Sequence, residues 1–153
     1  MSKRLIVALD FDNKVDALRT LDLLDCNKCM VKVGLQLFVS EGWELISAIK
    51  QKNFDIFLDL KLFDIGATVE AAVKGIAKYG LDFLTVHGDP NVVKAAKEGA
   101  ADSNLKILAV TILTSLEPEK IYVVRQGSPL IIAENDEIIV AVSYTHLTLP
   151  TKR

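Results

Sequence analysis

The sequence has no apolar run that approaches the roughly 20 residues needed to span a bilayer, so no membrane segment is expected. The apolar run that follows Arg4, Leu5 to Leu9, is too short for the core of a secretory signal. Lysine and arginine are scattered singly, which gives no basic stripe of the kind that binds nucleic acid. We therefore expect a cytoplasmic protein with no membrane and no nucleic-acid partner.

Cysteine is also scarce. Cys26 and Cys29 are spaced like half of a zinc site, but no second pair follows and His87 stands alone. A structural zinc ion needs four ligands, so we predict no metal site and reduced thiols, as is usual in the cytosol. The rest of the composition, 50% hydrophobic residues, 25% charged residues and a net charge of -2, is typical of an ordinary globular domain.

Short apolar runs rich in β-forming residues recur at nearly equal intervals. They are Leu5–Leu9, Met30–Gly34, Asp55–Leu58, Asp82–Val86 and Lys106–Val110. Segments with helical periodicity lie between them, at Val15–Leu24, Leu37–Lys50, Thr68–Tyr79 and Val92–Ala100. Gly80 and Gly99 fall where helix C-caps are expected. Continuous apolar strands that alternate with helices predict a parallel sheet covered by helices.

The equal units, without a Gly-x-Gly-x-x-Gly turn, favour an α/β fold of the (β/α)8 TIM-barrel family. A Rossmann-like sheet stays the alternative. A complete barrel needs eight units and roughly 250 residues, whereas this chain shows about five units. We therefore expect an incomplete barrel followed by an irregular tail.

Polar residues fall repeatedly at the expected carboxyl ends of the strands, which is where barrel enzymes place their chemistry. They are Asp10, Lys32, Asp59 with Lys61, His87, and the segment Thr111–Ser115. Taken one at a time, Asp10 could cap a helix and Lys32 could extend to solvent. His87 is most simply a core histidine, and loop hydrogen bonding could account for Thr111–Ser115. Their convergence on one rim nevertheless favours a functional site.

The string Asp59-Leu60-Lys61-Leu62-Phe63-Asp64 places three charges beside an apolar strand. Residues two apart share one face of a strand, so Asp59 and Lys61 should project side by side, with Asp64 on the turn beyond. Desolvated charges are costly unless they are paired. The string is therefore either a structural ion network or a reaction centre.

Five strings together resemble the orotidine 5'-monophosphate decarboxylase family, in order and at family-like spacing over about residues 4–118. They are Val7–Asp10, Val31–Gly34, Asp59–Thr68, Val86–Pro90 and Ala109–Ser115. Phe63 and Gly66-Ala67 stand where many members have His and Pro-Asn, a departure that leaves the charged positions intact.

The resemblance implies the decarboxylation of orotidine 5'-monophosphate to uridine 5'-monophosphate in de novo pyrimidine biosynthesis. The family works without a cofactor, as a homodimer with shared active sites. By resemblance, Lys61 would be the proton donor, and Asp59, Lys32 and Asp64 would complete an alternating array of charges.

The resemblance also assigns the substrate-binding residues, which would be Asp10, Lys32, Ile65, Thr68 and Thr114. Asp10 and Lys32 would contact the ribose, and Thr114 the pyrimidine. Asp64, Ile65 and Thr68 would reach the active site of the partner subunit.

Three segments follow from the extent of the resemblance: residues 1–118 form the barrel part, residues 119–141 diverge, and residues 142–153 form a tail. Tyr122–Ile131 is either a displaced remnant of the family's phosphate-binding segment or unrelated sequence. The tail resembles translated adapter sequence, so we give His146 and Arg153 no functional role. We expect the phosphate-binding residues to be missing and the truncated chain to have little activity.

Two competing hypotheses stay open. A phosphate-sugar aldolase similar to hexulose-phosphate synthase shares the Asp-x-Lys-x-x-Asp signature but uses a metal and carries an acidic residue where this chain has Lys32. A misassembled, non-catalytic fragment would leave open sheet edges and an exposed apolar interior, which favour aggregation.

Overall fold

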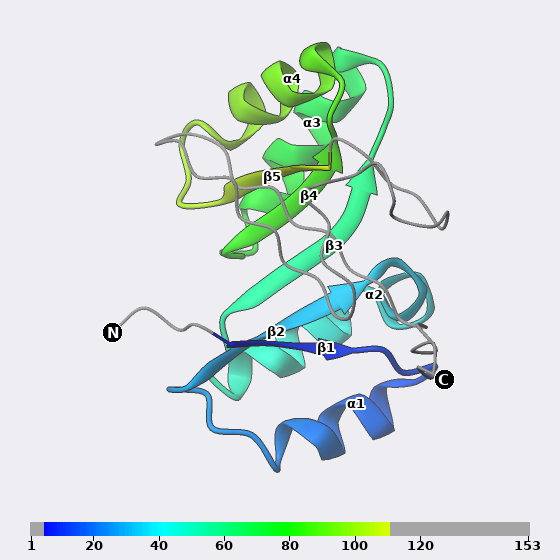
Figure 1. The fold of residues 1–153 in the computed structure, drawn as a ribbon, viewed down its shortest axis with the longest axis vertical. Helices are drawn as coiled ribbons and strands as arrows, with labels where there is room; N and C mark the ends of the chain where they lie inside the picture. The colour runs from blue at the N-terminus through cyan, green and yellow to red at the C-terminus, as the bar shows by residue number, and fades with distance from the viewer. Residues whose placement is uncertain (1–4, 111–153) are drawn as a thin grey trace, which may run out of the picture.

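Strands and helices alternate strictly through residues 5–110, which are the residues that the computed structural model describes (Figure 1). The strands are β1 (Leu5–Leu9), β2 (Cys29–Gly34), β3 (Ile56–Leu62), β4 (Phe83–His87) and β5 (Lys106–Val110). The helices are α1 (Lys14–Leu21), α2 (Leu35–Gln51), α3 (Gly66–Ala77) and α4 (Pro90–Ala100). Every predicted strand and helix in this range is present. β3 continues beyond its predicted end, so that Asp59 and Lys61 lie within the strand.

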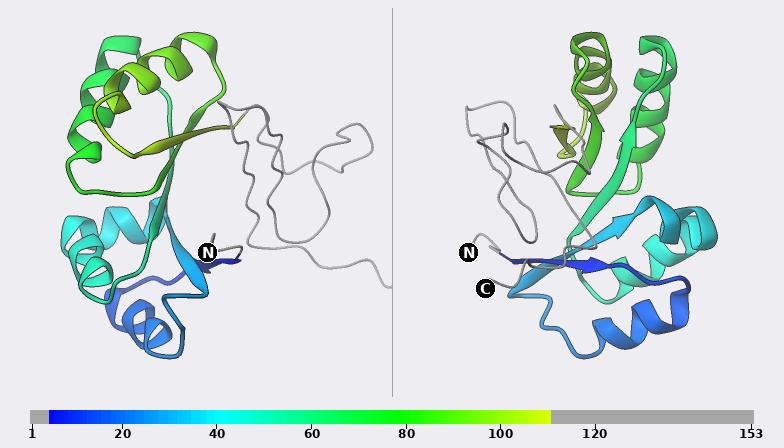
Figure 2. Two further views of the ribbon diagram at one scale, coloured as in Figure 1. Left: turned by 90° about the vertical axis from the view of Figure 1, so that its left-hand side faces the viewer. Right: turned by 45° about the vertical axis from the view of Figure 1, so that its right-hand side comes forward.

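The strands are all parallel and pair in sequence order, β1-β2-β3-β4-β5. The helices cover one side of this sheet, as the two views of Figure 2 show. A Rossmann sheet reverses its strand order at a switch point and carries helices on both faces. Sequential order with helices on one side is instead the winding of a TIM barrel. The prediction of an incomplete barrel is confirmed, and the Rossmann alternative is wrong.

Polar side chains fix the starts of two helices. Asn13 is the N-cap of α1, and its side chain accepts the backbone N–H of Asp16 at 3.0 Å. Asp89 caps α4 in the same way, and Pro90 occupies the first turn, where its missing N–H costs nothing. Because Asn13 performs this role in α1, the alternative in which Asp10 caps that helix is wrong.

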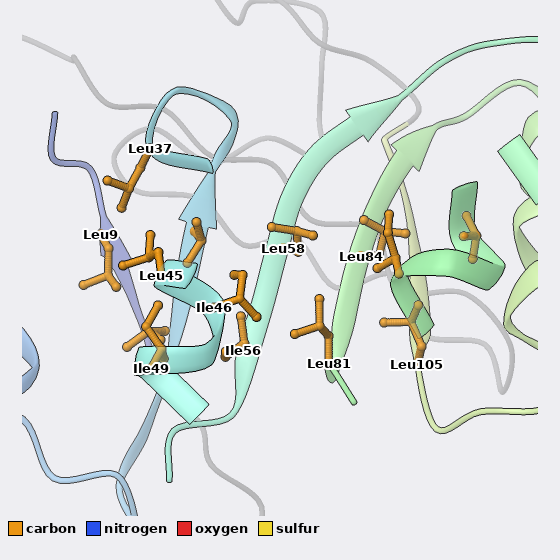
Figure 3. Packing of buried hydrophobic residues seen from close by; sticks show 14 of the residues in the cluster. Leu9, Leu37, Leu45, Ile46, Ile49, Ile56, Leu58, Leu81, Leu84 and Leu105 are labelled. Carbon is orange, nitrogen blue, oxygen red and sulfur yellow. The ribbon is translucent and has the colours of Figure 1, made fainter. Parts of the chain in front are cut away.

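The sheet buries a different set of side chains on each face. The face toward the helices packs against the apolar sides of the helices, as Figure 3 shows for Leu9, Leu45, Ile49, Ile56, Leu58 and Leu84. The opposite face carries a smaller cluster of Met30, Phe57 and Leu108, with Ile6 and Phe83 against it. Because side chains alternate along a strand, the residues two positions after Met30, Phe57 and Phe83 share this second face. Those residues are Lys32, Asp59 and Thr85.

Two glycines shape the ends and the packing of α3 and α4. Gly80 follows α3 with φ 63°, a left-handed conformation that glycine adopts without steric cost. Gly99 lies inside α4, so its predicted role as a C-cap is wrong. A Cβ atom at Gly99 would lie 2.5 Å from the carbonyl oxygen of Glu70 and 3.0 Å from Cβ of Val73. The glycine therefore permits α4 to approach the backbone of α3.

The helices of the described segment are all too short or too polar to cross a lipid bilayer.

Candidate active site

Lys32 of β2 lies between two carboxylates. Its Nζ atom is 3.6 Å from Oδ1 of Asp10 and 3.5 Å from Oδ2 of Asp59. The lysine and Asp59 side chains are only 8% and 4% exposed, whereas Asp10, just beyond β1, is 40% exposed. The lysine therefore does not extend to solvent, and that explanation of its place in a strand is wrong. A buried ammonium held by two carboxylates is compensated for the loss of its hydration.

Asp59 also contacts the second lysine of the string. Nζ of Lys61 donates to Oδ1 of Asp59 at 2.7 Å, while Oδ2 of Asp59 faces Lys32. The expectation that Asp59 and Lys61 lie side by side is confirmed. Asp10, Lys32, Asp59 and Lys61 thus form a line of alternating negative and positive charges, here called the charged row. Lys61, whose side chain is 26% exposed, is the accessible cation of the row.

The backbone of Lys61 has an unusual conformation. Its φ is 51°, in the left-handed region that costs a non-glycine residue about 1–3 kcal/mol. The pairing of β3 with β4 shifts at the same place: Leu58 pairs with Leu84, but Leu62 pairs with Val86. β3 therefore advances from 58 to 62 while β4 advances only from 84 to 86. The additional residues form an irregularity that directs the Lys61 side chain back toward Asp59.

Thr85 of β4 bonds to both members of this pair. Its hydroxyl donates to Oδ1 of Asp59 at 2.9 Å and accepts the backbone N–H of Lys61 at 2.9 Å. The residue is fully buried, with 0% of its surface exposed. Sequence reasoning missed it, because threonine is common in strands and carries no signal of its own. Its place two residues before His87, on the same strand face, was the available clue.

The residues that follow β3 do not join the charged row. Asp64 is exposed, and its Oδ1 atom accepts the backbone N–H of Ile65 at 2.6 Å. Ile65 is 78% exposed, and Thr68 is exposed near the start of α3. Within residues 5–110, no ion pair joins Asp64 to the charged row. The structure therefore brings Asp10, Lys32, Asp59 and Lys61 together and leaves these three residues at the surface.

His87 is exposed at the end of β4, so its interpretation as a core histidine is wrong. Its ring lies 4.5 Å, centroid to centroid, from the ring of Phe63, which is 66% exposed. Thr114, with the rest of Thr111–Ser115, lies outside the described residues, as do the segments 119–141 and 142–153. Residues 5–110 contain no group of three or more His, Cys, Asp or Glu side chains placed to hold a metal ion.

The charged row suits reactions in which negative charge develops next to Lys61. Each member of the row contacts its neighbour at 2.7 to 3.6 Å, so the four charged groups hold one another in place. A fixed cation can stabilise developing negative charge without reorganising. An ammonium that is partly accessible can also donate a proton to the atom that carries this charge.

Comparisons with known proteins point to one family. The family model described as "Orotidine 5'-phosphate decarboxylase / HUMPS family" matches residues 3–136. The orotidine 5'-phosphate decarboxylase of Jannaschia sp. (strain CCS1) is 58% identical over 115 residues, which are 74% of this chain and 50% of that protein. The protein of the same name from Ruegeria pomeroyi is 58% identical over 114 residues, 74% of this chain and 48% of its own.

A solved structure shows the same fold. The crystal structure of orotidine 5'-phosphate decarboxylase from Lactobacillus acidophilus matches with a TM-score of 0.70 and 39% sequence identity, over 77% of this chain and 57% of that one. The chain spans about half the length of the curated relatives it matches.

Proposed function

The chain belongs to the orotidine 5'-phosphate decarboxylase / HUMPS family, and from this premise we propose that it derives from an enzyme that decarboxylates orotidine 5'-monophosphate to uridine 5'-monophosphate in de novo pyrimidine biosynthesis. The observation that carries the proposal is the buried Lys32, held between Asp10 and Asp59. The similar phosphate-sugar aldolases carry an acidic residue at this position. Lys32 therefore favours decarboxylation over metal-dependent aldol chemistry.

The chemistry explains why two lysines are useful. Loss of CO2 from C6 of the orotate ring leaves a vinylic carbanion that no neighbouring carbonyl can delocalise. Without a cofactor, the protein itself must stabilise this charge with a cation that is already in place. In the proposed mechanism Lys61 stabilises the carbanion and then protonates C6 as a general acid.

Asp59 has a different part in the proposal. It is 4% exposed and is held by Lys32 and Lys61, so its negative charge has little freedom to move. In the proposed complex it lies next to the substrate carboxylate and raises the energy of the bound ground state. Departure of CO2 removes this repulsion, while the attraction of Lys61 for the carbanion grows. Both effects favour the transition state over the bound substrate.

We place the substrate along the charged row. Asp10 and Lys32 would contact the ribose, and Thr114, outside the described residues, would contact the pyrimidine. The active site of a second subunit would receive Asp64, Ile65 and Thr68. The active form would therefore be a homodimer, and we place it in the cytoplasm. The exposure of Asp64 and Ile65 after β3 supports this assignment, because within residues 5–110 neither side chain joins the charged row. Residues 119–141 and 142–153 have no part in the proposal.

Because the chain spans about half the length of its relatives, the activity should be tested in two proteins. The first is the 153-residue chain, for which we expect little turnover. The second is a chimera in which residues 1–110 precede the C-terminal half of the Jannaschia protein. We expect the chimera to convert orotidine 5'-monophosphate to uridine 5'-monophosphate with release of CO2.

The matched control is Lys61→Ala in the chimera. It should lower kcat by at least about a hundredfold, because a general acid and a fixed charge are lost together. Nucleotide binding, measured by calorimetry with uridine 5'-monophosphate, should persist. Near-normal activity of Lys61→Ala would contradict the mechanism. Metal-dependent aldol cleavage of a hexulose phosphate, without decarboxylation, would establish the aldolase instead.

A further inference from the structure

Thr85 belongs to β4, on which we have placed no group that touches substrate, yet it contacts both Asp59 and Lys61. We propose that Thr85 is a positioning residue: its hydroxyl fixes the Asp59 carboxylate and the Lys61 backbone, and thereby sets where the Lys61 ammonium stands. The catalytic meaning of that placement rests on the function proposed above, whereas the placement itself does not.

The hydrogen bonds of Thr85 form a closed ring. A hydroxyl has one proton to donate and two positions that accept. The proton goes to Oδ1 of Asp59, and an accepting position takes the N–H of Lys61. The same Oδ1 atom also receives Nζ of Lys61 at 2.7 Å. Lys61 is thus held at two points: its backbone amide bonds to Oγ1 of Thr85, and its ammonium bonds to Oδ1 of Asp59. These two oxygen atoms also bond to each other.

This ring explains how Lys61 keeps its left-handed backbone. In a regular parallel pair, the N–H of Lys61 would bond to a carbonyl of the next strand. The register shift between Leu58 and Leu62 interrupts the ladder here, and the hydroxyl of Thr85 supplies the acceptor instead. Without that acceptor, an amide in a partly buried strand would lose its partner. Residue 61 would then be free to return to an extended conformation and carry its ammonium away from Asp59.

Thr85 also orients the carboxylate of Asp59. The hydroxyl and the Lys61 ammonium both bond to Oδ1, which leaves Oδ2 to face Lys32. Rotation of the carboxylate out of this plane would carry its oxygen away from the hydroxyl and weaken the contacts with Thr85. The buried hydroxyl therefore fixes the plane of the carboxylate, with one oxygen toward Lys61 and the other toward Lys32. A residue that only filled space could be replaced by valine, which has nearly the same shape, with no effect on Lys61.

The test compares Thr85→Val, which removes the hydroxyl, with Thr85→Ser, which keeps it, in the 153-residue chain. Amide hydrogen exchange at Lys61 and the ¹⁵Nζ resonance of its ammonium are measured by NMR. In Thr85→Val we expect the Lys61 amide to exchange about tenfold faster or more, as the loss of one hydrogen bond predicts, and the ammonium resonance to shift. Thr85→Ser should retain both signals, and the amides of Leu84 and Lys106 should be unchanged in both variants.

The outcomes separate positioning from packing. Lys61 signals that stay unchanged in a folded Thr85→Val protein would overturn the proposal. The proposal would also be overturned if Thr85→Ser lost the Lys61 signals as Thr85→Val does, with both variants unfolding at the same thermal midpoint. If Thr85→Val does not fold, Thr85→Cys replaces it, because a thiol is only a weak donor and acceptor; the expected direction is the same. If the Lys61 signals behave as expected but the chimera never decarboxylates, the placement of Lys61 is supported and only the proposed function is rejected.

Discussion

Nζ of Lys32 and Oδ2 of Asp59 lie 3.5 Å apart on neighbouring strands, on side chains that are 8% and 4% exposed. The pair adjoins the apolar cluster of Met30, Phe57 and Leu108 on the same face of the sheet. A buried ion pair contributes little net stability, but the removal of one partner leaves the other charge buried without compensation. This asymmetry makes the pair testable.

Asp59→Leu should lower the free energy of unfolding by about 3 kcal/mol or more, because Lys32 then keeps only the half-exposed Asp10. The double variant Asp59→Leu/Lys32→Met should be more stable than Asp59→Leu alone, since no unpaired charge stays buried. Urea unfolding can be followed by the fluorescence of Trp43, the single tryptophan, which stacks on Tyr79. Asp10→Asn is the exposed control and should change stability by less than about 1 kcal/mol. Equal losses in the single and double variants would contradict this account.

Substitutions of Lys61 should reveal the cost of its backbone conformation. Lys61→Gly and Lys61→Ala both remove the ammonium, but only glycine adopts φ 51° without steric cost. We expect Lys61→Gly to be the more stable of the two by about 1 kcal/mol in urea unfolding. At Lys106, which has no positive φ, the order should be reversed, because glycine in a strand costs about 0.5–1 kcal/mol relative to alanine. If the glycine and alanine variants had the same order of stability at Lys61 and at Lys106, backbone strain at Lys61 would be disproved.

Gly99→Ala and Gly75→Ala should change stability in opposite directions. The new methyl group at Gly99 would meet the Glu70 carbonyl oxygen at 2.5 Å, so we expect a loss of about 1–3 kcal/mol. Nothing lies within 4 Å of a methyl group at Gly75, where alanine should stabilise α3 by up to about 1 kcal/mol. Thermal unfolding measured by circular dichroism distinguishes the two. A neutral Gly99→Ala would show that α3 and α4 can separate without cost.

Acid should weaken the loop that precedes β2. The backbone N–H of Asn27 donates to Asp25 at 2.9 Å and lowers the pKa of that carboxyl, with smaller contributions from the Asn27 side chain and Lys28. A pKa that is lower in the folded state stabilises the fold above the unfolded pKa, and this stability is lost as the pH falls through the folded pKa. Asp25→Asn should therefore be less stable than the parent at neutral pH. The difference should vanish in acid, and a difference that is constant with pH would contradict the assignment.

Sequence reasoning predicted the parts of the fold that depend on local pattern. Apolar runs and helical periodicity identify each strand and helix, because burial of one helix face and of continuous strands is visible in residue order. That Asp59 and Lys61 lie side by side was also expected from the alternation of side chains, but the contact itself depends on the left-handed backbone of Lys61 and the register shift beside it. The alternation of strands and helices along the sequence is common to the barrel and the Rossmann sheet. The pairing of the strands in the structure distinguished the two folds.

What the sequence did not predict depends on the pairing of separate strands and helices. The hydrogen bonds of Thr85 arise from the register of β3 against β4, and the left-handed φ of Lys61 arises from the shift in that register. The sequence alone does not distinguish a glycine that ends a helix from one that permits two helices to pack closely, as Gly99 does. His87 looked like a core residue because its strand is apolar, yet it lies at the exposed end of β4.

The bond from Thr85 to Asp59 also ties the site to a single alignment of the sheet. If β4 slid by one residue along β3, every side chain of β4 would change faces. Thr85 would turn toward the helices, and the apolar Leu84 or Val86 would stand against the Asp59 carboxylate. The hydrogen bonds that hold Lys61 therefore penalise misaligned strands, and a chain with mispaired β3 and β4 would lose the placement of the Lys61 ammonium.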